Sequence, residues 1–168
     1  MDSPTIREAQ RPDLDKIIAL FRQSERLHVE GHPDVFSVAN ADELLSIFEK
    51  FMADAAVANL VVEIDGLMIG YARYRIYQIP KSSFLKNSGA KQALIEEIVI
   101  SEDWRRHGLA RELILEIERR LRTLGIEYVK LSVFAFNKAA QGLYAALDYS
   151  PISMQLGKHL ASTRASYV

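Results

Sequence analysis

The chain of 168 residues contains no cysteine, which removes several classes of chemistry at once. Disulfide bonds, thiolate metal sites and cysteine nucleophiles are all excluded. An excess of charge of one sign is also lacking, because 21 basic and 22 acidic residues give a formal net charge of −1. Nucleic-acid-binding domains usually carry a basic field. We therefore expect no nucleic-acid partner.

Long apolar runs are missing as well. No stretch approaches the roughly 20 apolar residues that a membrane-spanning helix needs, and residues 1–10 lack the basic start and apolar core of a secretory leader. Hydrophobic residues make up 49% of the chain and charged residues 26%, which is typical of a globular protein in water. We expect a cytoplasmic protein without a membrane partner, folded as one domain over residues 1–168.

Segments typical of strands and of helices alternate along the chain. Apolar and β-branched patterns predict strands over residues 5–8, 56–64, 67–79, 93–100, 128–134 and 152–156. Apolar residues at helical spacing predict helices from about residue 12 to a break at Gly31, and over 41–53, 108–123 and 137–147. The order β-α-α-β-β-β-α-β-α-β predicts an α/β protein with one mixed sheet and helices on both faces.

Residues 104–110, between the fourth predicted strand and the third predicted helix, have the features of an anion site. A helix start offers backbone N–H groups without partners and a partial positive charge. Gly108 lets the backbone approach a ligand closely, Ala110 is small, and Arg105 and Arg106 add charged donors. The other interpretation is a solvated basic turn that caps an ordinary helix. The nucleotide motifs Gly-x-x-x-x-Gly-Lys-Ser/Thr and Gly-x-Gly-x-x-Gly are absent.

The spacing Arg105-x-x-Gly108-x-Ala110 resembles the acetyl-CoA pyrophosphate motif of the GCN5-related N-acetyltransferases. The predicted strand before it stands where this family has its fourth strand. Farther along, the spacing Asn137-x-x-Ala140-x-x-x-Tyr144 is similar to the second cofactor element of the family. The resemblance covers essentially the whole chain.

This resemblance implies the acyl-CoA N-acyltransferase fold, acetyl-CoA as cosubstrate, and transfer of an acetyl group to an amine. Members of the family are often dimers, so a homodimer is implied too. The sequence departs from the family pattern at Asp148, where glycine usually precedes an aromatic residue, here Tyr149. The departure concerns the local turn and not the cofactor site.

The resemblance also implies roles for single residues. Backbone N–H groups would hold the pyrophosphate, with help from the side chains of Arg105 and Arg111; these N–H groups belong to Arg106, His107, Gly108, Leu109 and Ala110. The main chain over Ile98, Val99 and Ile100 would pair with the pantetheine arm like an added strand, chiefly through Ile98 and Ile100. Asn137 would hydrogen-bond this arm, and Ala140 and Tyr144 would line the thioester end.

Acetyl transfer to an amine requires a base, because only about 0.04% of a primary alkyl amine is neutral at pH 7. Glu96 and Glu97 are the candidates, since carboxylates inside an apolar strand are costly without a purpose or a partner. Strict alternation allows only one of the two to face the reaction. Resemblance to the diamine and polyamine acetyltransferases favours Glu96, with Glu97 as second candidate. Alternatively, both acids pair with basic side chains at the surface.

The leaving group is a thiolate, which needs a proton or a hydrogen bond. The resemblance assigns this role to Tyr144, whose ordinary pKa near 10 exceeds the thiol pKa by ~1.5 units, so full proton transfer is uphill by about 2 kcal/mol. We expect Tyr144 to donate a hydrogen bond, or to have a shifted pKa; alternatively it is only a packed aromatic residue. By the same resemblance, the Ile98 N–H would polarise the thioester carbonyl.

The break between the first two helices is the region where this family commonly forms a substrate wall. His28 and Phe36 lie there, and Phe134 ends the fifth predicted strand, so these residues are candidates to contact the acceptor together with Glu96. A histidine and phenylalanines that only fill the core are the alternative. His28 and His32 have the spacing of a metal pair, but no third ligand is evident, so we predict no metal site.

Without a cysteine to carry the acetyl group, transfer should occur directly in a ternary complex. The predicted acceptor is a small amine, diamine-like by resemblance, although aminoglycosides and protein N-termini remain open. A function from another class is a sensor or partner domain that binds acyl-CoA without turnover. The presence of Glu96 and Tyr144 favours the enzyme.

Overall fold

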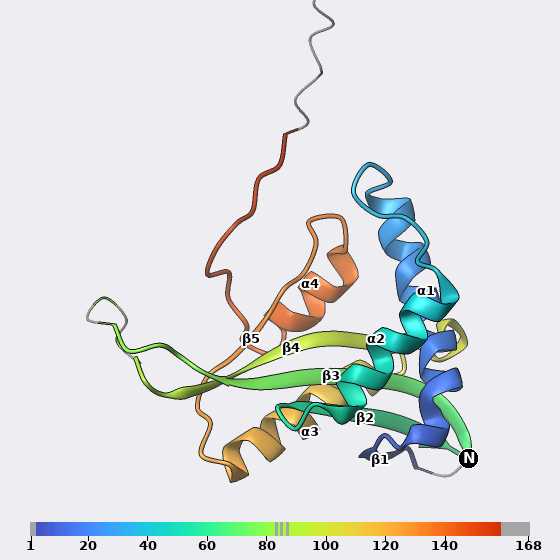
Figure 1. Cartoon of the computed structure of the whole chain (residues 1–168), viewed down its shortest axis with the longest axis horizontal. Coiled ribbons are helices and arrows are strands. Elements are labelled where there is room, and N and C mark those ends of the chain that lie inside the picture. Colours follow the sequence, from blue (N-terminus) through green and yellow to red (C-terminus); the bar gives the residue numbers. More distant parts are fainter. Residues whose placement is uncertain (1–2, 83, 85, 87, 159–168) are drawn as a thin grey trace, which may run out of the picture.

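The computed structural model describes residues 3–82, 84, 86 and 88–158, and its centre is one five-stranded sheet (Figure 1). The strand order is β1-β2-β3-β4-β5. The strands are β1 (Thr5–Glu8), β2 (Val57–Ile64), β3 (Leu67–Gln78), β4 (Lys91–Ile100) and β5 (Val129–Leu131). The first four pair antiparallel and β5 runs parallel to β4. The predicted mixed α/β sheet is confirmed.

Four helices cover the two faces of this sheet. A short 3-10 turn, η1 (Arg11–Asp13), leads into α1 (Leu14–Gly31), and a second, η2 (Glu102–Trp104), precedes α3; the other helices are α2 (Ala41–Ala53), α3 (Leu109–Thr123) and α4 (Lys138–Ala145). Helix α3 makes the crossover between the parallel strands β4 and β5. No helix in the described ranges is long and apolar enough to span a membrane.

Two apolar cores hold the layers together. On one face, the buried stripe of α3 that includes Leu113, Ile117 and Leu121 packs on the sheet, as its helical spacing predicts. On the other face, α1 and α2 bury Ile17 and Phe48 against the sheet. Each fully buried side chain of this size contributes about 1.5–3 kcal/mol to stability. The two cores therefore fix the helices to opposite faces of the sheet.

Strand β4 contains a bulge at Glu96. Arg73 of β3 pairs with Glu97 and the next residue pairs with Ile95, so Glu96 is an extra residue in β4. Before the bulge, the odd-numbered residues Ala93 and Ile95 pack toward α3. After it, the even-numbered residues Ile98 and Ile100 do so. The strict alternation expected for the two glutamates is therefore wrong, because the bulge turns both toward α1 and α2.

Strands β4 and β5 separate after a short parallel pairing. The pairing ends at Ile95 and Leu131, and β5 stops there instead of reaching residue 134 as predicted. The Ala93 N–H donates to Tyr128 O on the β5 side, whereas the Ser101 N–H donates to Ile69 O on the β3 side. Because the bulge lies between them, the N–H groups of Ile98 and Ile100 face the gap.

The predicted last strand over residues 152–156 is absent, so the described order ends with α4. Its alternating side chains Ile152, Met154 and Leu156 are 63%, 83% and 89% exposed. After α4 the chain runs away from the sheet (Figure 1). Alternation alone does not form a strand, because a strand needs the hydrogen-bonding edge of a neighbour.

Candidate active site

The turn at the start of α3 contains two residues with positive φ. Gly108 is the N-cap, with φ 83°, and Arg106 also has positive φ, 66°. The first helical bond runs from Glu112 N to Gly108 O at 3.1 Å, so the N–H groups of residues 108–111 have no partner inside the helix. A side chain added at Gly108 would meet no atom within 4 Å. Glycine is therefore needed here for its left-handed conformation and not for lack of space.

The structure brings the predicted pyrophosphate residues 106–110 together in this turn. Arg105 follows η2, and its Nε donates to Ile100 O at 3.2 Å, which ties the turn to the end of β4. His107 lies with its ring centroid 6.2 Å from that of Trp104, which packs against the α3-side core. Arg111 is exposed on the first turn of α3. The arrangement has the geometry of an anion site at a helix start.

Helix α4 follows β5 after a loop of six residues, 132–137. Asn137 is its N-cap: its Oδ1 accepts a hydrogen bond from Ala140 N at 3.1 Å. The helix is shorter than predicted, because Asn137 itself caps it and the chain turns after Ala145. The cap role leaves the Asn137 side-chain NH₂ without a hydrogen bond to any residue that the structure describes, as expected of a group that binds a ligand.

The turn after α4 forms although glycine is missing from it. Asp148 adopts the left-handed conformation, with φ 63°. The Tyr149 N–H donates to Tyr144 O at 3.0 Å, which closes the helix end in the way that a glycine usually permits. Tyr149 also donates from its hydroxyl to Glu118 Oε1 at 3.1 Å, which holds α4 against α3. The departure from the family pattern therefore does not disturb the turn.

Tyr144 lies partly buried in the second half of α4. Burial raises the pKa of its hydroxyl, and the charge of Glu97 raises this pKa further. Its hydroxyl makes no hydrogen bond with the described residues. Tyr144 therefore remains protonated at neutral pH and has a donor hydrogen available.

Glu96 is engaged in an ion-pair cluster. Its Oε2 accepts from Arg73 Nε at 2.8 Å, and its Oε1 accepts from Arg75 Nε at 3.0 Å. Arg75 also contacts Asp54 Oδ2 at 2.6 Å, and the Arg73 guanidinium lies 3.7 Å from the centre of the Phe51 ring. Both carboxylate oxygens of Glu96 thus have charged partners, as in the alternative interpretation of the sequence.

Glu97 has no arginine partner at hydrogen-bond distance. The Ser24 hydroxyl of α1 donates to its Oε1 at 3.0 Å. Burial raises the pKa of this carboxyl, and the Ser24 hydrogen bond and the charge of Arg73 offset part of the effect. A carboxyl with a raised pKa is a better proton acceptor near neutral pH than an ordinary one. Glu97 is therefore more suitable as a base than Glu96.

Sequence reasoning missed Ser24, although a signal was present. The predicted stripe of α1 runs through Phe21 and His28, and Ser24 fills the turn between them, facing β4. A small hydroxyl in an apolar stripe that faces two glutamates indicates a hydrogen bond. The bulge had no comparable signal, because apolar residues occupy consecutive positions on both sides of the two glutamates, at 93–95 and at 98–100.

The predicted acceptor residues His28, Phe36 and Phe134 come together. The His28 ring centre lies 5.3 Å from that of Phe36 and 5.1 Å from that of Phe134, and Phe136 is 5.8 Å away. The end of α1 packs closely here, since a side chain at Gly31 would meet the Phe136 ring at 2.6 Å. Glu96, also predicted to contact the acceptor, is instead held among the arginines.

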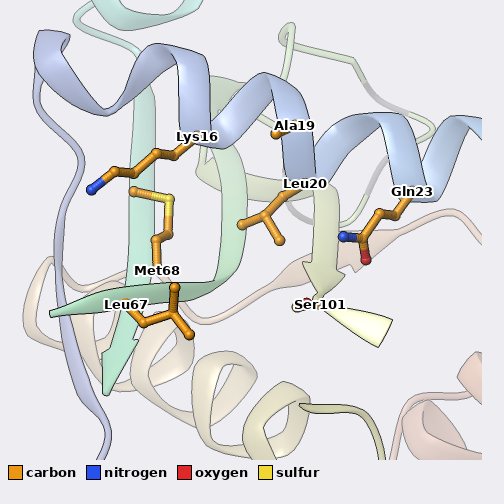
Figure 2. Close-up of a pocket in the computed structure, with 7 residues that line it drawn as sticks. All are labelled: Lys16, Ala19, Leu20, Gln23, Leu67, Met68 and Ser101. Atoms are coloured by element: carbon orange, nitrogen blue, oxygen red, sulfur yellow. The ribbon is translucent and has the colours of Figure 1, made fainter. Parts of the chain in front are cut away.

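A hollow of about 280 Å³ lies on the α1 side of the sheet, but it is not lined by any predicted site residue. Figure 2 shows its lining side chains, which come from α1, the start of β3 and the residue after β4. They are Lys16, Ala19, Leu20, Gln23, Leu67, Met68 and Ser101.

Comparison with known proteins adds to this geometry. The model of the Acetyltransferase (GNAT) family matches residues 18–149. An uncharacterized N-acetyltransferase of Bacillus subtilis (strain 168), YdgE, is 34% identical over 70 residues, which are 42% of this chain and 45% of that protein. The chain thus matches less than half the length of this curated relative.

Two solved structures show the same fold. The BH1408 protein from Bacillus halodurans, solved as a tetramutant, is 22% identical with a TM-score of 0.84, over 93% of this chain and 99% of that one. The aminoglycoside N-acetyltransferase AAC(6')-Iy, in complex with CoA, is 20% identical with a TM-score of 0.70, over 95% of each chain. The family match, which spans most of the sequence, establishes that the chain belongs to the acetyltransferase (GNAT) family.

Proposed function

We propose that this acetyltransferase moves the acetyl group of acetyl-CoA to the primary amine of a small molecule, directly in a ternary complex. The observation that carries the proposal is the position of Glu97. It is a carboxyl with a raised pKa and no arginine at hydrogen-bond distance, and it lies on β4 where this strand leaves β5, within electrostatic reach of Tyr144. In this proposal Glu97 acts as the base and Tyr144 as the hydrogen-bond donor of one site.

The cofactor half of the site is assigned to backbone groups. The N–H groups of residues 106–110, with Arg105 and Arg111 beside them, would hold the pyrophosphate at the start of α3. The N–H groups of Ile98 and Ile100, with Val99 between them, would pair with the pantetheine arm, and the Asn137 amide would bond it from across the gap. Acetyl-CoA supplies the activated acetyl thioester.

Glu97 is assigned the role of base, which accepts a proton from the acceptor amine. An ammonium must lose this proton before its nitrogen can attack, and a carboxyl with a raised pKa lies closer to the amine pKa than an ordinary carboxyl does. As the nitrogen–carbon bond forms, the carbon–sulfur bond breaks. Of the two protons that the ammonium loses, one passes to Glu97 and the other ends on the CoA sulfur. Glu96 keeps the arginines of β3 in place.

Tyr144 is assigned the role of donating a hydrogen bond to the leaving sulfur. Its raised pKa widens the gap to the thiol pKa, so the hydroxyl stabilises the developing negative charge by a hydrogen bond and does not give up its proton fully. The Ile98 N–H, which faces the gap, would polarise the carbonyl oxygen in the same step. Each of these groups interacts most strongly with the charge that develops during transfer.

The direct test is CoA release from acetyl-CoA over a panel of primary amines, with the acetylated product identified by mass spectrometry. A ternary-complex mechanism predicts intersecting initial-rate lines when both substrates are varied, and no acetyl-enzyme under denaturing mass spectrometry. Tight acetyl-CoA binding without turnover of any amine would overturn the proposal and favour a sensor domain. Parallel initial-rate lines would overturn the direct mechanism.

A further inference from the structure

The acceptor side of the gap carries a wall of aromatic rings. This aromatic wall consists of His28 on α1, Phe36 in the loop after α1, and Phe134 and Phe136 in the loop after β5. Phe36 and Phe134 meet edge to face at 5.0 Å between ring centres, and Phe134 and Phe136 stack at 5.6 Å. The rings hold one another, yet Phe134 remains 42% exposed. A ligand can therefore cover its outer surface.

The aromatic wall stands at the level of the reaction. The parallel register ends at Ile95 and Leu131, so Phe134 lies in the loop that begins where β4 and β5 separate. Ser24 joins the wall to the proposed base, because its hydroxyl donates to Glu97 while its carbonyl accepts from His28 Nδ1 at 2.7 Å. Because a carbonyl oxygen can only accept, this bond places a hydrogen on Nδ1.

Almost every buried carboxylate on this face already has a cationic partner. Glu96 binds Arg73 and Arg75, and Glu25 accepts from Arg22 at 2.6 Å and from the Ala39 N–H at 2.8 Å. The remaining one, Glu97, is needed for the reacting amine. Among the residues that the structure describes, the wall therefore offers no buried carboxylate to a second ammonium group.

Two further acids, Glu30 and Asp34, lie near the aromatic wall but are exposed to water. Exposed carboxylates attract amines from solution, but screening by water and salt makes each of them a weak partner for a bound cation. A second ammonium that is stripped of water in the site would have only ring faces as partners, and their attraction for a cation is weak beside the cost of removing its water. An aromatic or apolar body, in contrast, gains from covering the rings.

From this arrangement we infer that the acceptor is a primary amine on an aromatic or apolar body, without a second cationic group. The aromatic wall takes the body and Glu97 takes the proton of the ammonium. This inference rests on the proposed acetyl transfer and narrows its substrate class. It departs from the diamine-like acceptor that the sequence resemblance implies.

The test compares amines that differ in one property. With 2-phenylethylamine, kcat/KM should exceed that with 1,4-diaminobutane, spermidine or kanamycin at least tenfold, with hexylamine between them. Preference for any of the polycations over 2-phenylethylamine overturns the inference while it leaves the transfer function intact. If no amine is turned over, equilibrium binding to the CoA-saturated protein decides: failure to bind 2-phenylethylamine more tightly than 1,4-diaminobutane overturns the inference as well.

Two variants of the aromatic wall sharpen the test. Phe134→Ala should raise KM for 2-phenylethylamine about tenfold with little change in kcat, and Phe134→Asp should raise the relative rate with 1,4-diaminobutane at least tenfold. The matched control is Phe84→Ala, because Phe84 is 92% exposed in the loop that joins β3 and β4, at the end of these strands far from Ile100. An equal effect of Phe84→Ala, or an unchanged preference in both Phe134 variants with normal melting temperatures, contradicts the inference.

Discussion

The two halves of the candidate site are built from different parts of the chain. The cofactor half consists mainly of backbone N–H groups at the start of α3 and along the open edge of β4. The acceptor half consists of side chains, contributed by α1, by β4 and by the loop after β5. Backbone N–H groups are available at almost any residue, so the cofactor half needs only small residues at the positions where the ligand must come close to the chain. The second half needs particular side chains from distant positions.

The largest effect is expected in the acceptor half, from Glu97→Gln. This change should lower kcat/KM about 10²- to 10⁴-fold at pH 7, and the defect should shrink as the pH approaches the amine pKa, because the base then becomes dispensable. Since the raised pKa of Glu97 shifts its protonation upward, the acid limb of the wild-type profile should lie above the usual carboxyl range. The measurement is a pH–rate profile of CoA release.

Glu96→Gln is the matched control for this prediction. It removes the charge that the arginines of β3 contact, so it should lower the melting temperature more than Glu97→Gln does, and it should not remove the acid limb. A pH-independent defect in Glu97→Gln, or loss of the acid limb in Glu96→Gln, would assign the base to the other glutamate.

The cofactor half should be most sensitive at Gly108. Gly108→Val places a β-branched residue at φ 83°, so we expect acetyl-CoA affinity to fall at least about tenfold in calorimetry, because the turn must change conformation. Gly125→Val is the control, since Gly125 has φ 70° at the other end of α3. It should lower stability to a similar degree without weakening acetyl-CoA binding. Equal affinities of the two variants for acetyl-CoA would refute the assignment of the pyrophosphate to the turn at Gly108.

Tyr144→Phe should have an intermediate effect, because it removes one hydrogen bond to the leaving sulfur. A bond of about 1.4 kcal/mol corresponds to a tenfold lower kcat, with acetyl-CoA affinity nearly unchanged. Tyr149→Phe is the control: it removes the bond to Glu118 and should affect the melting temperature more than the rate. A normal kcat in Tyr144→Phe would show that the hydroxyl does not take part in the reaction and that this tyrosine serves only in packing.

The smallest expected effect concerns the turn after α4, outside both halves. Asp148→Gly should raise stability by about 0.5 kcal/mol, because glycine adopts φ 63° without the strain that an L side chain carries there. Asp148→Ala should lower stability instead. Thermal melts of the two variants measure the difference, and a stabilising alanine would show that the left-handed turn carries no strain.

The same contrast between backbone and side chains explains what the sequence could predict. Helix α3 has a long apolar stripe and a glycine at its start, so local residues were enough to predict its position and the turn before it. Strand β5 was predicted too long and a strand over 152–156 was predicted wrongly, because strands depend on partners that local patterns do not reveal. The contact of Ser24 with Glu97 crosses 73 positions and required the fold.

The separation of β4 and β5 leaves a sheet edge within the molecule instead of at its rim. An exposed edge of this kind at the rim would invite pairing with any extended chain, and so aggregation. Here the edge opens only between two strands of the same sheet, and the loop after β5 and helix α4 begin beside it. A strand of another protein would have to come between β4 and the chain that follows β5 to reach this edge. The position of the unpaired edge, inside the sheet, thus makes such pairing harder than it would be at the rim.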